Sequence, residues 1–354
     1  MVFERQLAHW LNGMSVLHYI HQTGQIHNGD PASTSRKQPM DTRQPLDATA
    51  VGLMLVLCLV WALQQVVLKS TAADIAPIFQ IALRSGVAAV LVALVMRARG
   101  ERMSLTDGTG WPGVVAGLLF GLEFWLVGEG LRLTSAAHMV VFLYTAPLFA
   151  ALGLHWRLPA ERLAPLQWLG IVLAFGGIAL AFLGRTEVSG PSGSRMLWGD
   201  LLGLLAGMAW GATTVVVRCS PLSRAPATQT LLYQLVGAFV LLTGVAWVSG
   251  QTHFKPTPEV WASLAFHSLV VSFGSFLAWF WLLRHYLASR LGVFSFLTPL
   301  FGLVLGAWLL DEAIEPSFLM GVGPVLIGIV LVSGHGWIAA WIARLGGRHR
   351  PTLP

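Results

Sequence analysis

Apolar runs of about 18–24 residues, separated by short polar segments, fill the chain from residue 48 onward. Each run is long enough to cross the hydrocarbon core of a bilayer as a helix. We identify ten of them, at 49–69, 75–96, 111–131, 134–155, 166–184, 198–217, 228–248, 261–283, 288–309 and 317–341. The pattern predicts an all-α integral membrane protein with ten transmembrane helices.

The residues that interrupt these runs recur at a nearly constant interval, which is the signature of an internal repeat. Matching residues stand 152 positions apart before the charged elbow that follows the fourth run, and 151 positions apart after it. The matches are Pro147 with Pro299, Trp156 with Trp308, Glu161 with Glu312, Gly170 with Gly321, and Gly177 with Gly328.

The first run also resembles the sixth. Trp61 and Lys69 in VWALQQVVLK correspond to Trp210 and Arg218 in AWGATTVVVR, 149 positions later. We therefore predict two repeats of five spans, at residues 48–184 and 198–341. Because five is odd, the second repeat enters the membrane from the opposite face, which gives the inverted-topology repeat of many secondary transporters.

Charged residues are scarce and unevenly placed. They make up 11% of the chain, whereas soluble domains carry about 25%. With the N-terminus inside, 16 of the 22 Lys and Arg residues fall in inner segments and five in outer segments, and Arg84 lies within a span. This bias predicts that both termini lie in the cytoplasm. It also explains the net charge of +6 without a nucleic-acid partner.

The two ends of the chain differ from its apolar middle. Residues 1–47 are polar and are predicted to form a disordered extension, with Met40, just before the first span, as a candidate start of the natural protein. Residues 342–354 form a basic tail that we expect in the cytoplasm.

Two charged residues fall inside predicted spans, Arg84 in the second and Glu123 in the third. A charge facing lipid costs about 2.5–3.5 kcal/mol, so both side chains are expected to face the interior of the bundle. Their similar depth predicts an ion pair. The pair would lie on a substrate or proton path, or it would only fix helix packing.

Other polar and aromatic side chains within the spans are candidates for lining a cavity, because a polar group facing lipid would lack a hydrogen-bond partner. His138 and His267 are interpreted as hydrogen-bonding groups between helices, with a proton relay as the alternative. The candidate cavity residues, besides Arg84 and Glu123, are Trp61, Gln64, Gln65, Gln80, Tyr144, Trp210, Thr213, Tyr233 and Trp279.

Two pairs of repeat-related residues are candidates for a structural role. Pro147 and Pro299 lie within the fourth and ninth spans, where each removes an intrahelical hydrogen bond and can act as a hinge. Glu161 and Glu312 lie in the elbows, and we expect each carboxylate to cap the N-terminus of the helix that follows it.

Motifs of enzymes and ATP-driven pumps are missing from the sequence. It has no GxxxxGK[ST] phosphate-binding loop, no HExxH zinc motif and no GxSxG nucleophile turn. The two cysteines, Cys58 and Cys219, have no metal-binding spacing. We therefore predict no catalytic residues, no metal and no cofactor.

The paired elbows and the matching first and sixth spans resemble the drug/metabolite transporter superfamily, specifically the EamA-type ten-helix permeases. The residues that carry this resemblance include Pro147, Glu161 and their counterparts, and Gly199-Asp200 before Trp210. It implies an inner-membrane carrier, usually an exporter of amino acids or other small metabolites, with a central cavity walled by most spans except the fifth and tenth. The residues that it places near that cavity are Trp61, Gln65, Arg84, Trp210 and Tyr233.

The leading hypothesis is a secondary transporter, and in the manner of that family an exporter, which moves a small metabolite such as an amino acid or amine by alternating access. Protons are the candidate coupling ion through Glu123, with simple facilitated diffusion as the alternative. The protein would act as a monomer or a homodimer. A membrane-embedded enzyme and a non-transporting receptor are the alternatives.

Overall fold

A computed structural model describes residues 47–101, 103, 107–183, 191–286, 294–295, 297–336, 338 and 341. Within these residues the chain is mainly helical, and an isolated β-bridge joins Ile75 and Phe254. The predicted basic tail, and the predicted extension apart from Asp47, lie outside the described residues.

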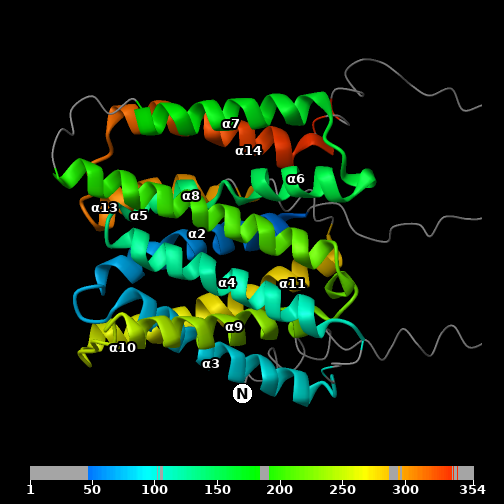
Figure 1. The fold of residues 1–354 in the computed structure, drawn as a ribbon, viewed down its shortest axis with the longest axis vertical. Helices are drawn as coiled ribbons and strands as arrows, with labels where there is room; N and C mark the ends of the chain where they lie inside the picture. The colour runs from blue at the N-terminus through cyan, green and yellow to red at the C-terminus, as the bar shows by residue number, and fades with distance from the viewer. Residues whose placement is uncertain are drawn as a thin grey trace, which may run out of the picture.

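The first half of the chain forms helices at the five predicted positions (Figure 1). The fourth position is divided into two helices. The elements are α2 (Ala48–Ser70), α3 (Pro77–Ala98), α4 (Gly110–Leu131), α5 (Ala136–Leu143) with α6 (Ala146–Arg157), and α7 (Pro165–Leu183).

The second half repeats this order. Its third position is divided by a π-helix, η4. Residues 287–293 and 296, which include the start of the fourth position, lie outside the described residues, and helix α13 begins at Leu297. The elements are α8 (Pro191–Arg218), α9 (Ala227–Val248), α10 (Pro258–Ala265) with η4 (Phe266–Ser275) and α11 (Phe276–His285), α13 (Leu297–Leu309), and α14 (Pro316–Ser333).

Seven of these helical segments are long and apolar enough to cross a membrane. They correspond to predicted spans one to four and six to eight. The remaining three positions hold the shorter apolar helices of α7, α13 and α14. The positions of the predicted spans therefore agree with the helices, while ten crossings stay a prediction.

Capping residues and prolines explain where several helices begin. The Asp47 carboxylate accepts a hydrogen bond from the Ala50 amide, at 2.8 Å, and so caps α2. Ser135 caps α5 and Thr257 caps α10 in the same way, each through the amide three residues on. Proline, which lacks an amide proton, occupies the first turn of α3, α6, α10 and α14.

The fourth predicted span is divided at Pro147. Helix α5 ends at Leu143, and α6 begins at Ala146 with Pro147 in its first turn. A proline cannot donate to the preceding turn and clashes with it, so the helix restarts rather than continues. Pro299 occupies the corresponding place in the first turn of α13.

The helices alternate in direction, so their ends gather at two faces of the bundle (Figure 1). We call the face where α2 ends the Ser70 face, and the face where α8 ends the Arg218 face. Exposed tryptophans lie at helix ends on both faces, as in the aromatic belts of membrane proteins. They are Trp198, Trp247, Trp261 and Trp308 at the Ser70 face, and Trp111, Trp156 and Trp168 at the Arg218 face.

The two repeats are packed into each other rather than side by side. Helix α4 of the first repeat packs on α8 and α9 of the second, and α2 packs on α13. Helices α7 and α14, the last of each repeat, form a close pair at one edge of the bundle (Figure 1). Four repeat-related glycines, Gly170, Gly177, Gly321 and Gly328, make that close approach possible.

Candidate functional site

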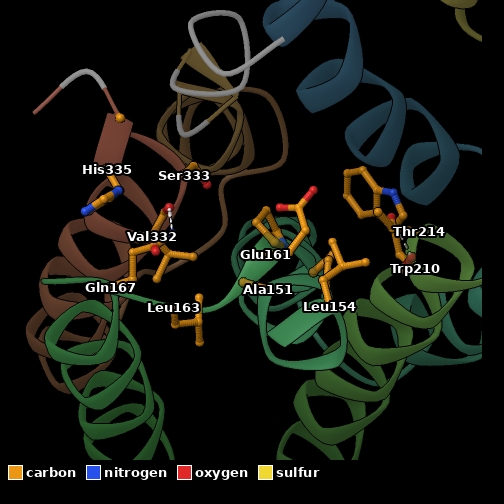
Figure 2. A pocket seen from close by; sticks show the side chains of 14 residues that line it. Ala151, Leu154, Glu161, Leu163, Gln167, Trp210, Thr214, Val332, Ser333 and His335 are labelled. Atoms are coloured by element: carbon orange, nitrogen blue, oxygen red, sulfur yellow. Dashed lines mark hydrogen bonds between the residues drawn. The ribbon is translucent and has the colours of Figure 1, made fainter. Parts of the chain in front are cut away.

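A cavity of about 460 Å³ lies at the Arg218 face, between α6, α7, α8 and α14 (Figure 2). Its walls come from both repeats. Helix α6 contributes Ala151 and Leu154, and α8 contributes Trp210. The opposite wall includes Gln167 of α7 and Val332 of α14. We call this cavity the Trp210 pocket.

The walls of the Trp210 pocket combine apolar surface with a few polar groups. Its carboxylate is that of Glu161, and its imidazole is that of His335 (Figure 2). The Gln167 amide donates to the Val332 carbonyl at 3.0 Å, which ties α7 to α14 at the rim. A pocket of this size, mostly apolar with a few convergent polar groups, is typical of a small-molecule site.

The indole of Trp210 links the pocket to the bundle interior. Its ring meets that of Tyr144 edge to face, with centroids 5.3 Å apart. Tyr144 is buried at the end of α5. A line of aromatic and polar side chains therefore leads inward from the pocket.

Arg84 and Glu123 are both buried, at 3% and 4% exposure, but they do not form the predicted ion pair. The Arg84 guanidinium instead donates to the Gln64 side chain at 3.0 Å and lies over the Phe124 ring, 4.5 Å from its centroid. The predicted ion pair is therefore not formed within 4.0 Å, and the contact with Gln64 of α2 is made by Nη1 of the guanidinium.

Two buried polar atoms in this region have no hydrogen-bond partner among the described residues. They are Oε2 of Glu123 and Nε of Arg84. A buried group without a partner is costly, and it commonly marks the place of a water molecule or ligand. This part of the bundle is therefore a candidate inner site.

A polar cluster adjoins Arg84 toward the Ser70 face. Gln80 of α3 donates to the Ser263 hydroxyl and lies 3.3 Å from Nδ1 of His267. The other ring nitrogen of His267, Nε2, lies 3.1 Å from the Gln64 carbonyl oxygen. Nδ1 also lies 2.8 Å from the Ser263 carbonyl oxygen, so each ring nitrogen faces a backbone carbonyl. His267 of η4 thus links α2 and α3. This agrees with its interpretation as a hydrogen-bonding group between helices.

The π-helix presents further polar groups to α2. Ser275 accepts a hydrogen bond from the Trp61 indole at 3.0 Å, and the Trp279 ring meets Trp61 edge to face at 5.8 Å. π-Helical segments often occur at functional sites, because the wider turn redirects side chains and frees backbone carbonyls. Trp61 and Trp279 are therefore held together where η4 and α11 meet α2.

The remaining candidate cavity residues have separate surroundings. Gln65 is buried, and its side-chain oxygen has no partner among the described residues. The Thr213 hydroxyl bonds back to the Ala209 carbonyl within α8. The Tyr233 ring packs across a glycine of α4, Gly113. Of the residues that the family resemblance placed near a central cavity, Trp210 is the one that lines the Trp210 pocket.

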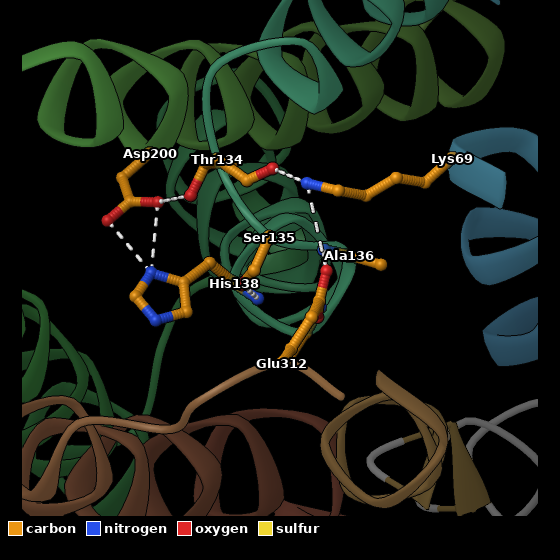
Figure 3. Close-up of polar contacts among 8 residues, drawn as sticks. Lys69, Thr134, Ser135, Ala136, His138, Asp200 and Glu312 are labelled. Carbon is orange, nitrogen blue, oxygen red and sulfur yellow. Dashed lines mark hydrogen bonds and ion pairs between the residues drawn. The ribbon is translucent and has the colours of Figure 1, made fainter. Parts of the chain in front are cut away.

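Glu312 caps a different helix from the one predicted. Its two carboxylate oxygens accept from the Ala136 and Ala137 amides, at 2.7 and 3.1 Å, and so cap α5 of the other repeat (Figure 3). Helix α14, which follows Glu312 in sequence, begins instead at Pro316. Glu161 likewise forms an ion pair with Arg218 of α8. The elbows thus bind across the two repeats.

Asp200 was not among the candidate side chains, although it is fully buried in the first half of α8. It accepts from the Thr134 hydroxyl, and its Oδ2 lies 3.0 Å from Nδ1 of His138 (Figure 3). The His138 ring stacks on Phe318, with centroids 3.5 Å apart. An acidic residue just inside an apolar run is the sequence signal that could have identified Asp200 as a buried side chain with a polar partner.

The model of the EamA-like transporter family matches residues 48–183 and again residues 197–334. The chain belongs to this family. The two matched ranges coincide with the two repeats, so the predicted membership of the drug/metabolite transporter superfamily is confirmed.

Similar proteins include an uncharacterized transporter of Bacillus subtilis, YoaV, which is 23% identical over 77% of this chain and 92% of its own length. An uncharacterized transporter of Synechocystis is 28% identical over 77% of this chain and 86% of its own length. A crystal structure of another protein superposes with a TM-score of 0.57, covering 85% of this chain and all of its own, at 18% identity. This last likeness concerns the fold.

Proposed function

We propose that this EamA-family protein is a secondary transporter that exports a small metabolite across the inner membrane by alternating access of its two repeats. In this proposal all ten apolar segments cross the membrane. The Arg218 face lies in the cytoplasm together with both termini, and the Ser70 face lies outside. Membership of a transporter family supports movement of a solute over catalysis or signalling.

The Trp210 pocket carries the proposal. It opens among the helix ends of the Arg218 face, where both charged partners Glu161 and Arg218 are exposed to solvent. At the Ser70 face, by contrast, Lys69 and Glu312 meet beside the buried Asp200 side chain and its histidine partner. An alternating-access carrier opens at one face at a time, and we assign this arrangement to the state in which the Arg218 face is the open one.

The chemistry of the pocket and of the line leading inward favours an amino acid or an amine. The lining offers an indole, a hydroxyl, an amide and a carboxylate, with apolar surface between them. Such walls suit a small amphipathic molecule with an ammonium group, because the face of an indole such as that of Trp210 attracts cations. A polyanion would find few cationic partners there.

Glu123 is our candidate for the coupling group. It is buried, it makes no direct contact with Arg84, and one of its oxygens lacks a partner among the described residues. A carboxyl group in such surroundings can bind and release a proton as the candidate inner site opens to one face of the bundle or the other. Protons are therefore the coupling ion that we propose.

The proposal can be tested in liposomes with a mixture of metabolites in place of a single chosen substrate. Proteoliposomes would be loaded with a deproteinised extract of the cells that make the protein, and released metabolites would be measured by mass spectrometry. Wild type is expected to release at least one amino acid or amine faster than the Trp210→Ala variant does. Release identical to that of protein-free liposomes would overturn the proposal, and a new product without release would favour an enzyme.

A further inference from the structure

Two ion pairs occupy equivalent places in the two repeats and cross from one repeat to the other. Lys69, at the end of the first helix of repeat one, pairs with the elbow residue Glu312 of repeat two. Arg218, at the end of the first helix of repeat two, pairs with the elbow residue Glu161 of repeat one. The sequence offset relates Lys69 to Arg218 and Glu161 to Glu312. One pair lies at each face of the bundle.

The pair at the Ser70 face is enclosed. Nζ of Lys69 lies 3.7 Å from Oε1 of Glu312, and it also donates to the carbonyl oxygen of Thr134 (Figure 3). The Glu312 side chain is only 9% exposed and caps α5, and its Oε2 atom packs against Gly306. An ion pair with this many hydrogen bonds and little solvent holds its elements firmly, because breaking it strands a buried charge.

The pair at the Arg218 face has equivalent partners in a different environment. The Arg218 and Glu161 side chains are 56% and 37% exposed, against 29% and 9% for Lys69 and Glu312. Glu161 also lines the Trp210 pocket (Figure 2). Solvent screens an ion pair this exposed, so it stabilises the present arrangement only weakly.

We propose that Lys69–Glu312 and Arg218–Glu161 are the two halves of a conformational lock, in which the enclosed pair shuts its own face and the exposed pair marks the open one. The two pairs exchange environments when the repeats exchange conformations. In the opposite state Arg218 and Glu161 are enclosed, and the Trp210 pocket is shut. This inference rests on the proposed function, because a lock of this kind has a purpose only in a carrier with two open states.

The lock makes opposite predictions for its two halves. Loss of the Lys69 charge destabilises the state seen here, so the population shifts toward a closed Trp210 pocket. Loss of the Arg218 charge destabilises the opposite state, so the pocket stays open. Two purely structural ion pairs would not bias pocket accessibility in opposite directions.

The test uses a reporter cysteine inside the pocket, with the buried Cys58 left in place. Ala151 lines the pocket (Figure 2), and Ala151→Cys would be introduced with Cys219→Ser in the full-length protein. The rate of modification by a membrane-impermeant maleimide would be measured in inverted vesicles. The variants are Lys69→Gln with Lys69→Arg as its charge-conserving rescue, and Arg218→Gln with Arg218→Lys.

Lys69→Gln is expected to slow modification by about threefold or more, and Lys69→Arg to restore it. Arg218→Gln is expected to leave the rate equal to or above that of the wild type, while metabolite release falls. The matched control is Arg132→Gln, which removes an exposed pair with Glu129 within a single repeat at the Ser70 face. It should change neither measurement.

Equal modification rates in Lys69→Gln and Arg132→Gln, in protein that elutes as a single folded species, would overturn the lock. So would a fall of the same size in Lys69→Gln and Arg218→Gln. Metabolite release from wild-type proteoliposomes is measured in parallel. If release is absent, the transport proposal fails; if release is present while the rates are unchanged, the lock alone fails.

Discussion

The contact between α7 and α14 gives a sharp test of how closely the two repeats meet. A methyl group added at Gly177 would lie 2.5 Å from the Gly321 carbonyl oxygen and 2.8 Å from the Val325 amide nitrogen. Both are backbone atoms of α14, so neither can rotate away. At Gly176, one residue earlier, the same methyl group would meet nothing within 4 Å. Gly176→Ala is therefore a matched control for Gly177→Ala.

The loss of stability in Gly177→Ala follows from how far α14 must move away from the added methyl group. Ordinary contact begins near 3.4 Å, so α14 must move by about 0.9 Å, and packed side chains on both sides of the contact lose dispersion energy. Overpacking of this kind costs about 1–3 kcal/mol. Replacing a helical glycine by alanine gains about 0.5–1 kcal/mol, but that gain is common to both variants. Gly177→Ala should therefore be less stable than Gly176→Ala by about 1–3 kcal/mol.

The assay is reversible unfolding in mixed micelles of increasing SDS content, followed by tryptophan fluorescence. The expected result is a lower midpoint for Gly177→Ala and an unchanged or slightly higher midpoint for Gly176→Ala. Equal midpoints for the two variants would refute the close backbone contact between α7 and α14.

Three further predictions concern single side chains. Glu123→Gln should abolish metabolite release while the protein still folds and reaches the membrane; undiminished release would remove Glu123 from the transport path. Ser275→Ala should leave the Trp61 indole without its acceptor and lower stability by about 1–3 kcal/mol, measured by SDS unfolding against wild type; an unchanged midpoint would show that the indole does not depend on this hydroxyl. Hydrogen bonds from the Ala50 amide and the Tyr286 hydroxyl lower the pKa of Asp47 from its ordinary value of 3.8. Asp47→Ala should therefore reduce thermal stability above pH 3.8, and its difference from wild type should vanish as the pH falls through the lowered pKa; a difference that grows in acid would contradict this assignment.

The positions of the helices were predictable because a long, uninterrupted apolar run in the sequence identifies a candidate membrane helix. The repeat was predictable for a related reason, since both copies keep the residues that end a helix or allow close packing, such as Pro147, Pro299 and the glycines of α7 and α14. These features act locally or at short range.

The partners of polar side chains were harder to predict. Glu312 was expected to cap the next helix in sequence, but the fold brings the start of α5 closer. Arg84 was expected to contact Glu123, but Gln64 of α2 lies at hydrogen-bond distance. Depth along a helix can be counted from its end, whereas the rotation that aims a side chain at one neighbour cannot. The repeat pattern does not show how each helix is rotated about its axis. The partner of Glu312 lies in the other repeat, and the partner of Arg84 lies on a different helix of the same repeat.

The inverted repeat is the claim on which the whole account depends, and one pair of positions tests it directly. Cys219 is exposed just after α8, and Ser70 is the repeat-related position, exposed at the end of α2. An impermeant maleimide would be applied to intact cells and to inverted vesicles carrying either wild type or Ser70→Cys with Cys219→Ser. We predict that Cys219 reacts only in inverted vesicles and that the cysteine at position 70 reacts only in intact cells. Reaction of both from the same side would contradict the inverted arrangement and the transport mechanism built on it.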